Sequence, residues 1–299
     1  MKAGGLTLLL FLIARPTLLA WGEKAHLMVN EAATRGVPND MPVFFYKAFS
    51  RLTYLGPEPD RWYTGHFASI GAANFPEHFI DYEYVKGLPL PPDRYRFIDL
   101  LYTSGTLRKY NIGNATTGFA PWRIAELCDL LTVQWRLWRD SWPGAEREQI
   151  EQNIIHVAGT LGHYVGDTAN PHHTTIHYNG WVGTTNPEHF RTDCETHGRF
   201  EHYFVTRALD LPDVIRYMRP PVLRRDYFAT AMAHVEESNA LVETLYRIDR
   251  DGGFDSHDGT PEAREFAARR LAAGASMLRD LWWSTWRSSE ERLVDWRTP

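Results

Sequence analysis

The chain has 299 residues, of which 43% are hydrophobic and 23% charged, and it carries a formal net charge of −5 at pH 7. This composition is ordinary for a soluble globular protein, and the length permits one or two domains. The acidic balance argues against a general nucleic-acid-binding protein, which usually presents a basic face, although a local basic cleft stays compatible with it.

The first twenty residues have the pattern of an export signal. Lys2 supplies a positive end, an apolar run covers residues 6–14, and the segment closes on Leu18-Leu19-Ala20. The apolar run is too short to cross a bilayer as a helix, which takes about 20 residues, and no later stretch is long enough. We therefore expect a signal peptide at 1–20, cleavage near Ala20, and export to the periplasm or beyond the cell. The mature chain would begin at Trp21.

Most of the mature chain is predicted to be helical. Apolar residues recur at spacings of three and four, which is typical of amphipathic helices. The predicted helices cover residues 23–36, 42–54, 123–140, 145–168, 195–209, 224–249 and 261–288. Thr260-Pro261-Glu262 begins the last of them with a capping hydroxyl and a proline in the first turn.

Loops are predicted at 56–76, 87–121, 169–194 and 249–259, where glycine, proline and polar residues gather. Strand signals are weak, and no repeat or linker divides the chain. We therefore predict one all-α domain over residues 21–299. Its core is expected to include apolar residues of the two C-terminal helices, namely Phe228, Met232, Val235, Leu241, Leu245, Leu271, Met277, Leu278 and Leu281, together with Trp282, Trp283 and Trp286.

The segment GHYVGDTANPHH, residues 162–173, is the most informative part of the chain. His163 and Asp167 are four residues apart in a predicted helix, so their side chains leave the same face. Pro171 cannot continue the helix and can turn His172 or His173 back toward that face. Two imidazoles and one carboxylate would then converge on one point, as metal ligands do.

A second set of possible ligands follows, and the sequence leaves two pairs open. His197 and Glu201 are four residues apart in a predicted helix, and His189 and Asp193 have the same spacing in the preceding loop. A single helical histidine is more often a core residue than a ligand, but two such pairs favour a metal site. Nitrogen and oxygen donors without thiolates favour zinc, with manganese and iron as alternatives.

Other candidates lie nearer the N-terminus. A free amine on Trp21, created by signal cleavage, could chelate a metal with its own carbonyl oxygen, and His26 could add an imidazole. Asp60, His78 and Asp81 stand in a predicted loop, where surface carboxylates are usually only solvated. His66 is a weaker candidate than His78 because it lacks the Ile-Asp that follows His78 and Phe79.

The order of these motifs carries a resemblance. Trp21, HFID at 78–81, HYVGDTANPHH at 163–173 and HGRFE at 197–201 resemble the zinc-dependent phospholipase C family. That family is a relative of the S1/P1-type nucleases and shares their helical fold and trinuclear zinc centre. The His189 pair is less similar to the phospholipase branch than the His197 pair.

The resemblance implies three zinc sites. One zinc would be bound by Asp60, His78, His163 and Asp167, and a second by His173, His197 and Glu201. The third would be bound by the amine and carbonyl of Trp21, by His26 and by Asp167, which would bridge two metals. Asp60 lies 18 residues before His78, farther than the family pattern suggests, so another carboxylate could replace it.

The resemblance also implies a function. Several cations in one cleft suit phosphodiester hydrolysis by metal-activated water, and the family suggests Asp60 as the carboxylate that guides or accepts the proton of that water. The expected substrate is a phospholipid or another phosphodiester, with peripheral contact to a membrane surface, and the protein is expected to be a monomer.

Two alternatives remain at this stage. A single-strand nuclease or 3′-nucleotidase would bind nucleic acid and need aromatic side chains to stack bases, for which the candidates are Trp62, Tyr63, Phe67, Tyr178 and Trp181. A catalytically inactive zinc-binding protein is the other. Cys128 and Cys194 would either form a disulfide in an exported protein or remain as two buried thiols.

Overall fold

The computed structural model describes residues 22–186 and 188–291. Trp21, the signal segment at 1–20 and the last eight residues lie outside this part. The described residues form helices and turns without a named strand, apart from two isolated bridges, Ile80 with Gly118 and Tyr178 with Gly180. The prediction of an all-α fold is therefore confirmed for these residues.

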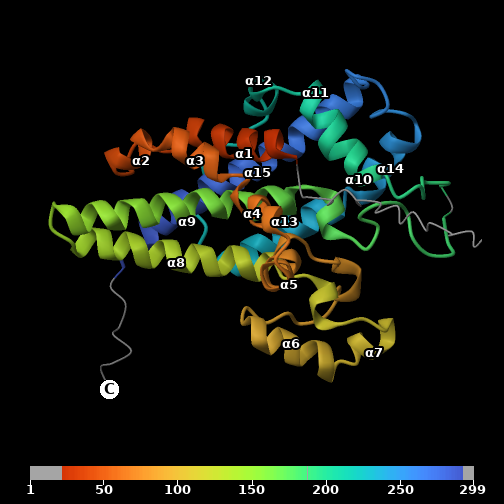
Figure 1. The fold of residues 1–299 in the computed structure, drawn as a ribbon, viewed down its shortest axis with the longest axis horizontal. Coiled ribbons are helices and arrows are strands. Elements are labelled where there is room, and N and C mark those ends of the chain that lie inside the picture. The colour runs from red at the N-terminus through yellow and green to blue at the C-terminus, as the bar shows by residue number, and fades with distance from the viewer. Residues whose placement is uncertain (1–21, 187, 292–299) are drawn as a thin grey trace, which may run out of the picture.

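Long helices form the body of the molecule (Figure 1). They are α1 (Glu23–Arg35), α8 (Ala120–Asp140), α9 (Ala145–Ala169), α13 (Tyr227–Asn239) and α15 (Pro261–Ser288). Helix α9 is the central one, because it packs against α8, α15, α1 and α3 (Phe49–Leu55). Every residue of α9 from Val157 to Ala169 is buried. Its C-terminal half therefore holds side chains away from bulk water.

Two glycines let other helices approach α9 closely. A Cβ atom at Gly162 would lie 2.0 Å from Oδ1 of Asn30, and one at Gly159 would lie 2.4 Å from Cβ of Leu55. Nδ2 of Asn30 donates hydrogen bonds to the carbonyl oxygens of Leu52 (2.7 Å) and Gly159 (2.9 Å), so α1, α3 and α9 are joined at this point. The close approach brings α1 within reach of the polar side chains of α9.

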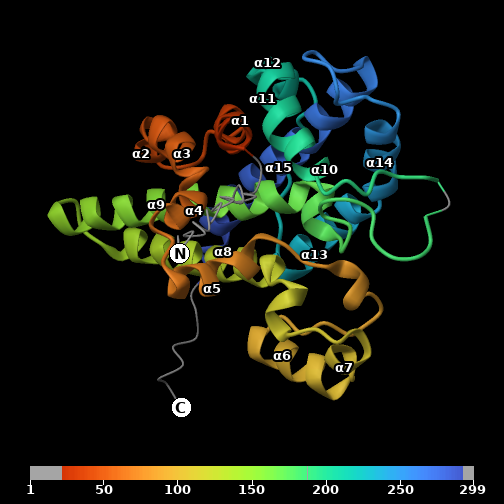
Figure 2. The same cartoon turned by 45° about the vertical axis from the view of Figure 1, so that its right-hand side comes forward.

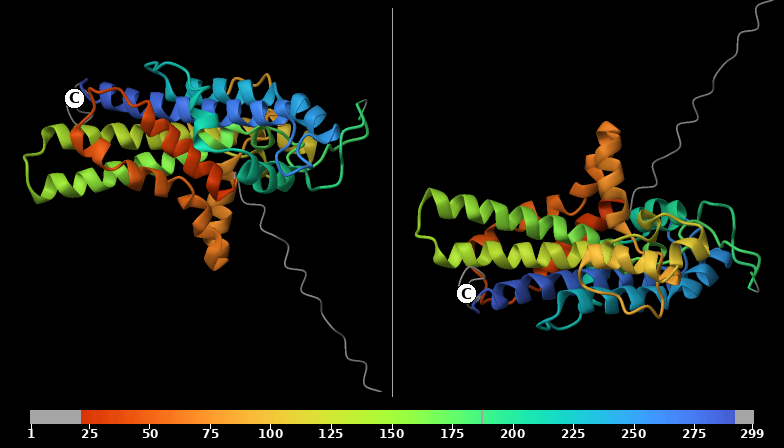
Figure 3. Two further views of the ribbon diagram at one scale, coloured as in Figure 1. Left: turned by 90° about the horizontal axis from the view of Figure 1, so that it is seen from above. Right: turned by 90° about the horizontal axis from the view of Figure 1, so that it is seen from below.

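Shorter elements surround these helices. They are α2 (Val43–Lys47), α4 (Glu58–Arg61), η1 (Trp62–Gly65), α5 (Ala68–Asn74), η2 (Phe75–His78), η3 (Tyr82–Tyr84), α6 (Arg94–Thr103), α7 (Thr106–Tyr110), η4 (Asn114–Thr117), η5 (Pro171–Thr174), α10 (Thr196–Gly198), the π-helical turn η6 (Arg199–Val205), α11 (Thr206–Ala208), α12 (Leu211–Ile215) and α14 (Val242–Arg250). Helices α6 and α7 form a small lobe beside the bundle (Figure 2). The segment that contains α4 and α5 projects from its flank (Figure 3).

The hydrophobic residues form a main cluster and a smaller one. The main cluster joins α1, α3, α8, α9 and α15, and the smaller one lies beneath α6 around Phe97, Leu101 and Trp122. The predicted core is confirmed as buried for Val235, Leu245, Leu271, Met277, Leu278, Leu281, Trp282 and Trp286, while Phe228, Met232, Leu241 and Trp283 are partly buried. None of the described helices combines the length and apolar character that a membrane span requires.

Most predicted helices are present, but three predicted loops are wrong in part, since 169–194 contains η5. The stretch 56–76 contains α4, η1 and α5, and the stretch 87–121 contains α6, α7 and η4. Helix α6 begins at a cap, since the carboxylate of Asp93 accepts a hydrogen bond from the amide of Arg96, and it buries Phe97 and Leu101 one turn apart. The predicted helix 224–249 is divided at Ala240 and Leu241 into α13 and α14.

Candidate metal centre

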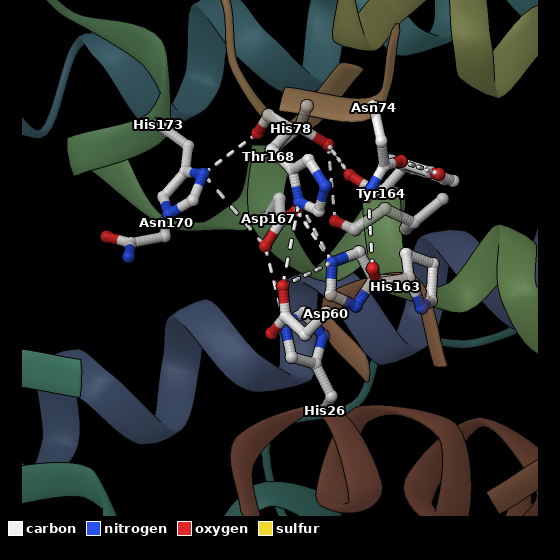
Figure 4. A network of polar contacts seen from close by, with 12 residues as sticks. His26, Asp60, Asn74, His78, His163, Tyr164, Asp167, Thr168, Asn170 and His173 are labelled. Atoms are coloured by element: carbon white, nitrogen blue, oxygen red, sulfur yellow. Dashed lines mark hydrogen bonds and ion pairs between the residues drawn. The ribbon is translucent and has the colours of Figure 1, made fainter. Parts of the chain in front are cut away.

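Elements far apart in the sequence bring eight predicted ligands to one region. The residues are His26 on α1, Asp60 on α4, His78 at the end of η2, His163 and Asp167 on α9, His173 on η5, His197 on α10 and Glu201 in η6. Each of these side chains is buried. Figure 4 shows His26, Asp60, His78, His163, Asp167 and His173 pointing toward one another.

Four of them form a first donor group, defined as Asp60, His78, His163 and Asp167. Nδ1 of His78 and Nε2 of His163 lie 3.0 Å apart. Oδ2 of Asp167 lies 3.0 Å from Nδ1 of His78 and 3.3 Å from Nε2 of His163. Oδ1 of Asp60 lies 3.5 Å from Nε2 of His163 and 3.9 Å from Nδ1 of His78.

These separations have the size expected of ligands to one metal ion. Donors about 2.0–2.1 Å from a tetrahedral zinc lie about 3.3 Å from one another. Five of the six separations within this group lie between 3.0 and 3.9 Å and bracket that length. The first donor group therefore fits a four-coordinate zinc site without a large movement of any side chain.

Backbone carbonyls orient two of the imidazoles. Nδ1 of His163 donates a hydrogen bond of 2.9 Å to the carbonyl oxygen of Gly56, and Nδ1 of His173 donates one of 2.8 Å to the carbonyl oxygen of His78. A histidine that donates through one nitrogen keeps the lone pair on the other nitrogen for a metal. These bonds direct Nε2 of both rings into the centre.

A second donor group consists of His173, His197 and Glu201. Oε1 of Glu201 lies 3.2 Å from Nε2 of His173 and 2.6 Å from Nε2 of His197. Nδ2 of Asn170 also donates to Oε1 of Glu201. His197 lies on α10, and Glu201 lies in the π-helical turn that follows it, a wide helical geometry that occurs often at functional sites.

Asp167 connects the first donor group to His26. Its Oδ2 faces His78 and His163, whereas its Oδ1 lies 3.4 Å from Nε2 of His26 and 3.9 Å from Nδ1 of His173. The two oxygens of one carboxylate thus point in different directions. This arrangement suits a carboxylate that binds two metal ions at once.

Several donor atoms of these residues are buried and have no hydrogen-bond partner. They include ring nitrogens of His26 and His197, Oδ1 of Asp60, Oδ1 of Asp167 and Oε2 of Glu201. A buried polar atom without a partner costs free energy, and such atoms are rare in folded proteins. Metal coordination satisfies lone pairs of this kind, so the residues fit bound divalent cations.

Electrostatic effects in the metal-free protein favour ionised carboxylates. Burial opposes ionisation of Glu201, but His197 and His173 outweigh it and hold the pKa of this carboxyl well below its usual range. Burial likewise opposes ionisation of Asp60, and His163, His26 and His78 lower its pKa below the usual value. Ionised carboxylates are the form that binds metal.

The pKa values of His173 and His26 are shifted in opposite directions. Burial lowers the pKa of His173, but Asp167 and Glu201 outweigh it and raise the pKa to about 9. Burial and the neighbouring His163 lower the pKa of His26 well below its ordinary value. A cation bound by these residues would therefore displace a proton from His173 and meet a neutral ring at His26.

The third predicted site is described only in part. His26 stacks on His163 with ring centroids 3.9 Å apart, and the two rings meet Asp167 in one group of possible ligands. Trp21, whose amine and carbonyl are the other predicted ligands, lies outside the described residues. The described part therefore supplies His26 and Asp167 to this site.

Comparisons with known proteins give a distant likeness. No family model matches the chain, and no curated protein matches it by sequence. Among solved structures, the alpha toxin from Clostridium absonum is 12% identical at a TM-score of 0.45, with 93% of this chain and 68% of the toxin covered. The alpha-toxin from the avian strain SWCP of Clostridium perfringens is 12% identical at a TM-score of 0.41, covering 92% of this chain and 66% of the toxin. The interpretation of the site depends on its own geometry.

The alternative ligands lie away from the centre. His189 and Asp193 are exposed, and the carboxylate of Asp193 accepts a hydrogen bond of 2.5 Å from Arg199. His66 is exposed as well, whereas His78 is buried in the first donor group. Of the two adjacent histidines, His173 belongs to the second donor group and His172 does not. The ring of His172 is buried beside it and stacks on that of His197, with ring centroids 5.3 Å apart.

Several other expectations are decided by the described residues. Cys128 and Cys194 do not form a disulfide, and only Cys128 is buried, so neither expectation about the pair holds. Of the aromatic candidates for base stacking, Phe67 and Tyr178 are exposed and Trp62, Tyr63 and Trp181 are partly buried. The ring of Tyr178 lies 6.3 Å from that of His197.

Sequence reasoning missed two neighbours of the centre. The hydroxyl of Tyr164 donates a hydrogen bond of 2.9 Å to Oδ1 of Asn74, and its ring lies 5.5 Å from that of His78. The guanidinium of Arg123 lies 5.3 Å from the centre of the same tyrosine ring. Tyr164 follows His163 directly in the sequence, which is the one local signal that pointed to it.

Proposed function

We propose that this chain is an exported zinc-dependent phosphodiester hydrolase that acts on phospholipids as a phospholipase C. The observation that carries the proposal is the position of Asp167 between the first donor group and His26, with its two oxygens facing different histidines. Two metals about 3.5–4 Å apart and joined by a shared carboxylate are typical of enzymes that hydrolyse phosphate esters.

In this proposal the first donor group holds one zinc and the second donor group holds another. A third would be bound by His26, Asp167 and the terminal amine and carbonyl of Trp21. Bound zinc would lower the pKa of a water molecule toward neutrality and neutralise the charge that builds on the phosphate. The resemblance of the motifs to the zinc-dependent phospholipase C family supports zinc over manganese or iron.

Residues of the chain prepare the site for this chemistry. Asp60 remains ionised at neutral pH because of the histidines around it, so the carboxylate oxygen that does not bind zinc can accept a proton from the attacking water. The bonds from His163 to Gly56 and from His173 to His78 keep the imidazoles in place while charge changes in the centre. The general contribution of such a positioned base is about 10²–10⁴-fold in rate.

The projecting segment around α5 favours a lipid over a polynucleotide. Between Trp62 and Pro76 the chain has no Asp, Glu, Lys or Arg. Phe67 is 66% exposed and Phe75 is 58% exposed on this segment. A polynucleotide would need cations here, whereas uncharged aromatic side chains suit peripheral contact with a membrane surface.

The proposal is tested with purified protein that begins at Trp21 and is loaded with zinc. Release of phosphocholine from phosphatidylcholine is compared with hydrolysis of single-stranded DNA and of a 3′-nucleotide. His163→Asn should abolish the activity, and the matched variant His189→Asn, at an exposed position, should retain it. Hydrolysis of DNA alone would favour the nuclease alternative, and full zinc content without hydrolysis of any substrate would favour an inactive zinc-binding protein.

Export and a monomeric state belong to the same proposal. Expression of the full chain in a bacterial host, followed by fractionation and N-terminal sequencing, should give a protein outside the cytoplasm that begins at Trp21. Light scattering during gel filtration should give the mass of one chain. A retained Met1, or a mass of two chains, would contradict these parts of the proposal.

A further inference from the structure

A pocket borders the candidate metal centre on the side of α5 and α8. Its volume is about 660 Å³, and its wall includes Trp62, Ile70, Ala73, Asn74, Glu77 and Arg123. Trp62 is two residues from Asp60, and Glu77 directly precedes His78. The wall of the pocket therefore includes residues one and two positions from two members of the first donor group.

The carboxylate in this wall already has an ion-pair partner. Arg94 donates hydrogen bonds to both oxygens of Glu77, one of 2.9 Å from Nη2 to Oε2 and a second from Nη1 to Oε1. A bidentate pair of this kind is the strong form of a carboxylate ion pair. The same guanidinium also donates hydrogen bonds of 2.8 and 2.7 Å to the two oxygens of Glu126, so Arg94 is shared by two carboxylates while both oxygens of Glu77 remain hydrogen-bonded.

The guanidinium in this wall is not neutralised. Arg123 lies over the ring of Tyr164 at 5.3 Å, its Nε is buried without a hydrogen-bond partner, and it makes no ion pair with any carboxylate of the described residues. An arginine presents five donors in a fork that matches a carboxylate or a phosphate. Arg123 is therefore the one charged side chain of this wall without an ion-pair partner among the described residues.

We propose that this pocket binds a second anionic group of the substrate, next to the phosphodiester that is cleaved, and that Arg123 recognises it. The inference rests on the proposed function and specifies its substrate class as a phospholipid whose headgroup carries a carboxylate or a further phosphate. Arg123 and His78 contact the same ring of Tyr164, at 5.3 and 5.5 Å, so a single aromatic ring separates the guanidinium from a residue of the first donor group. The apolar part of the wall, at Trp62, covers the carbon atoms between the two charges.

The test compares two substrates that differ only in the headgroup carboxylate, phosphatidylserine and phosphatidylethanolamine. Dihexanoyl forms are used below their micelle concentration, so that membrane surface charge plays no part. For the zinc-loaded protein we expect kcat/KM to be higher for the serine lipid. Arg123→Gln should lower kcat/KM for the serine lipid by about 10- to 100-fold, the effect of one lost hydrogen bond to a charged group. The same variant should change kcat/KM for the ethanolamine lipid less than about twofold.

Two further variants separate recognition from general effects. Arg123→Lys keeps the charge but not the fork, and it should restore part of the lost kcat/KM. Arg51→Gln removes an exposed arginine on α3, which contacts Tyr54, and should leave both substrates unaffected. The midpoint of thermal unfolding of each variant shows whether the fold is retained.

A binding measurement does not depend on turnover. Isothermal titration of the zinc-loaded protein with O-phosphoserine and with phosphoethanolamine should show tighter binding of phosphoserine, and Arg123→Gln should remove the difference. If this pattern appears without hydrolysis of any phospholipid, the pocket inference stands and the proposed function fails. The inference would be overturned if Arg123→Gln lowered kcat/KM equally for both lipids, or if the unaltered protein bound both phosphate esters equally. So would a loss by Arg123→Gln that is confined to single-stranded DNA, because the anion would then be a nucleic-acid phosphate.

Discussion

Nδ1 of His163 donates a hydrogen bond of 2.9 Å to the carbonyl oxygen of Gly56. The bond joins the central helix α9 to the turn between α3 and α4, two elements that are about a hundred residues apart in sequence. It also leaves Nε2 of His163 directed at Asp60, which follows Gly56 by four residues. One backbone carbonyl thus fixes the orientation of an imidazole and the distance from that imidazole to a carboxylate on the neighbouring helix.

Asp167 is expected to be the residue on which metal binding depends most. Its Oδ2 lies 3.0 Å from Nδ1 of His78 and its Oδ1 lies 3.4 Å from Nε2 of His26, so its loss removes an oxygen donor from two sites together. Asp167→Ala should lose bound zinc and nearly all hydrolytic activity. Elemental analysis of the purified variant gives the number of zinc ions per chain.

The matched control is Asp258→Ala. The side chain of Asp258 is 83% exposed and pairs with His257, away from the donor groups. This variant should keep the zinc content and activity of the unaltered protein. An Asp167→Ala protein with the same zinc content as the control would rule out a bridging role for Asp167.

Gly162 is expected to be intolerant of a side chain. An added Cβ would lie 2.0 Å from Oδ1 of Asn30 and 2.7 Å from Cδ2 of Leu278, so α1 or α15 must move. Overpacking of this kind costs about 1–3 kcal/mol. Urea unfolding of Gly162→Ala in the presence of a chelator measures the change in the free energy of unfolding without a contribution from metal.

Gly71→Ala provides the comparison for this substitution. Gly71 stands in α5, and no heavy atom outside its neighbours lies within 4 Å of a Cβ built there. Alanine should leave stability unchanged or raise it by up to about 1 kcal/mol, because alanine favours a helix over glycine. Equal effects of the two substitutions would mean that the contact at Gly162 relaxes without cost.

His234 should make the protein less stable in acid. Burial and the neighbouring Arg270 lower the pKa of His234 from 6.5 to about 3. As the pH falls, a histidine with a lowered pKa is protonated in the unfolded state before it is protonated in the folded state. The free energy of unfolding is therefore unaffected by His234 above pH 6.5 and decreases as the pH falls from 6.5 toward 3. One such group contributes at most about 1.4 kcal/mol per pH unit to the slope.

The measurement is the free energy of unfolding of His234→Gln across this pH range. The variant should show a shallower decline with acid than the unaltered protein. His156→Gln, at an exposed position on α9, serves as the control and should keep the original slope. Identical slopes for all three proteins would show that His234 does not contribute to acid unfolding.

An extension of the mature N-terminus should reduce metal binding. His26 and Asp167 supply the described donors of the third site, with Nε2 and Oδ1 3.4 Å apart, and the remaining predicted donors belong to a free amine and carbonyl at Trp21. A peptide nitrogen cannot replace a free amine as a ligand. Protein with Gly-Ser placed before Trp21 should bind less zinc per chain than protein that begins at Trp21; equal zinc content would eliminate the terminal chelate.

Local spacing predicted the arrangement around α9 because each step depends on helix geometry. His163 and Asp167 share a face at a separation of four residues, and Pro171 ends the helix so that His173 turns back. The pair His197 and Glu201 has the same spacing. The contribution of Arg123 was not predictable in this way, because its position depends on how α8 packs beside the segment that contains α5.

The fold was predictable where apolar periodicity runs over many residues. Helices α9 and α15 lie within one residue of their predicted bounds, since both have long apolar faces and α15 has a hydroxyl cap at Thr260. Short helices were missed in stretches rich in glycine and proline. Helix α6 has only Phe97 and Leu101 as fully buried residues, too few for periodicity to distinguish it from a loop.

The aromatic residues of the projecting segment should anchor the protein to lipid. Phe67 and Phe75 are 66% and 58% exposed in a stretch without Asp, Glu, Lys or Arg. Burial of a phenylalanine side chain in an apolar phase gains about 1.5–3 kcal/mol, so a double change to serine should weaken binding to phosphatidylcholine vesicles by at least about tenfold. Exposed positions tolerate substitution with little effect on stability, and hydrolysis of monomeric dihexanoyl phosphatidylcholine should therefore persist.

The matched control is the double variant Val222→Ser with Leu223→Ser, at two residues that are 46% and 48% exposed in another part of the molecule. Co-sedimentation with vesicles should separate the two double variants, and equal binding by both would place the membrane contact away from α5.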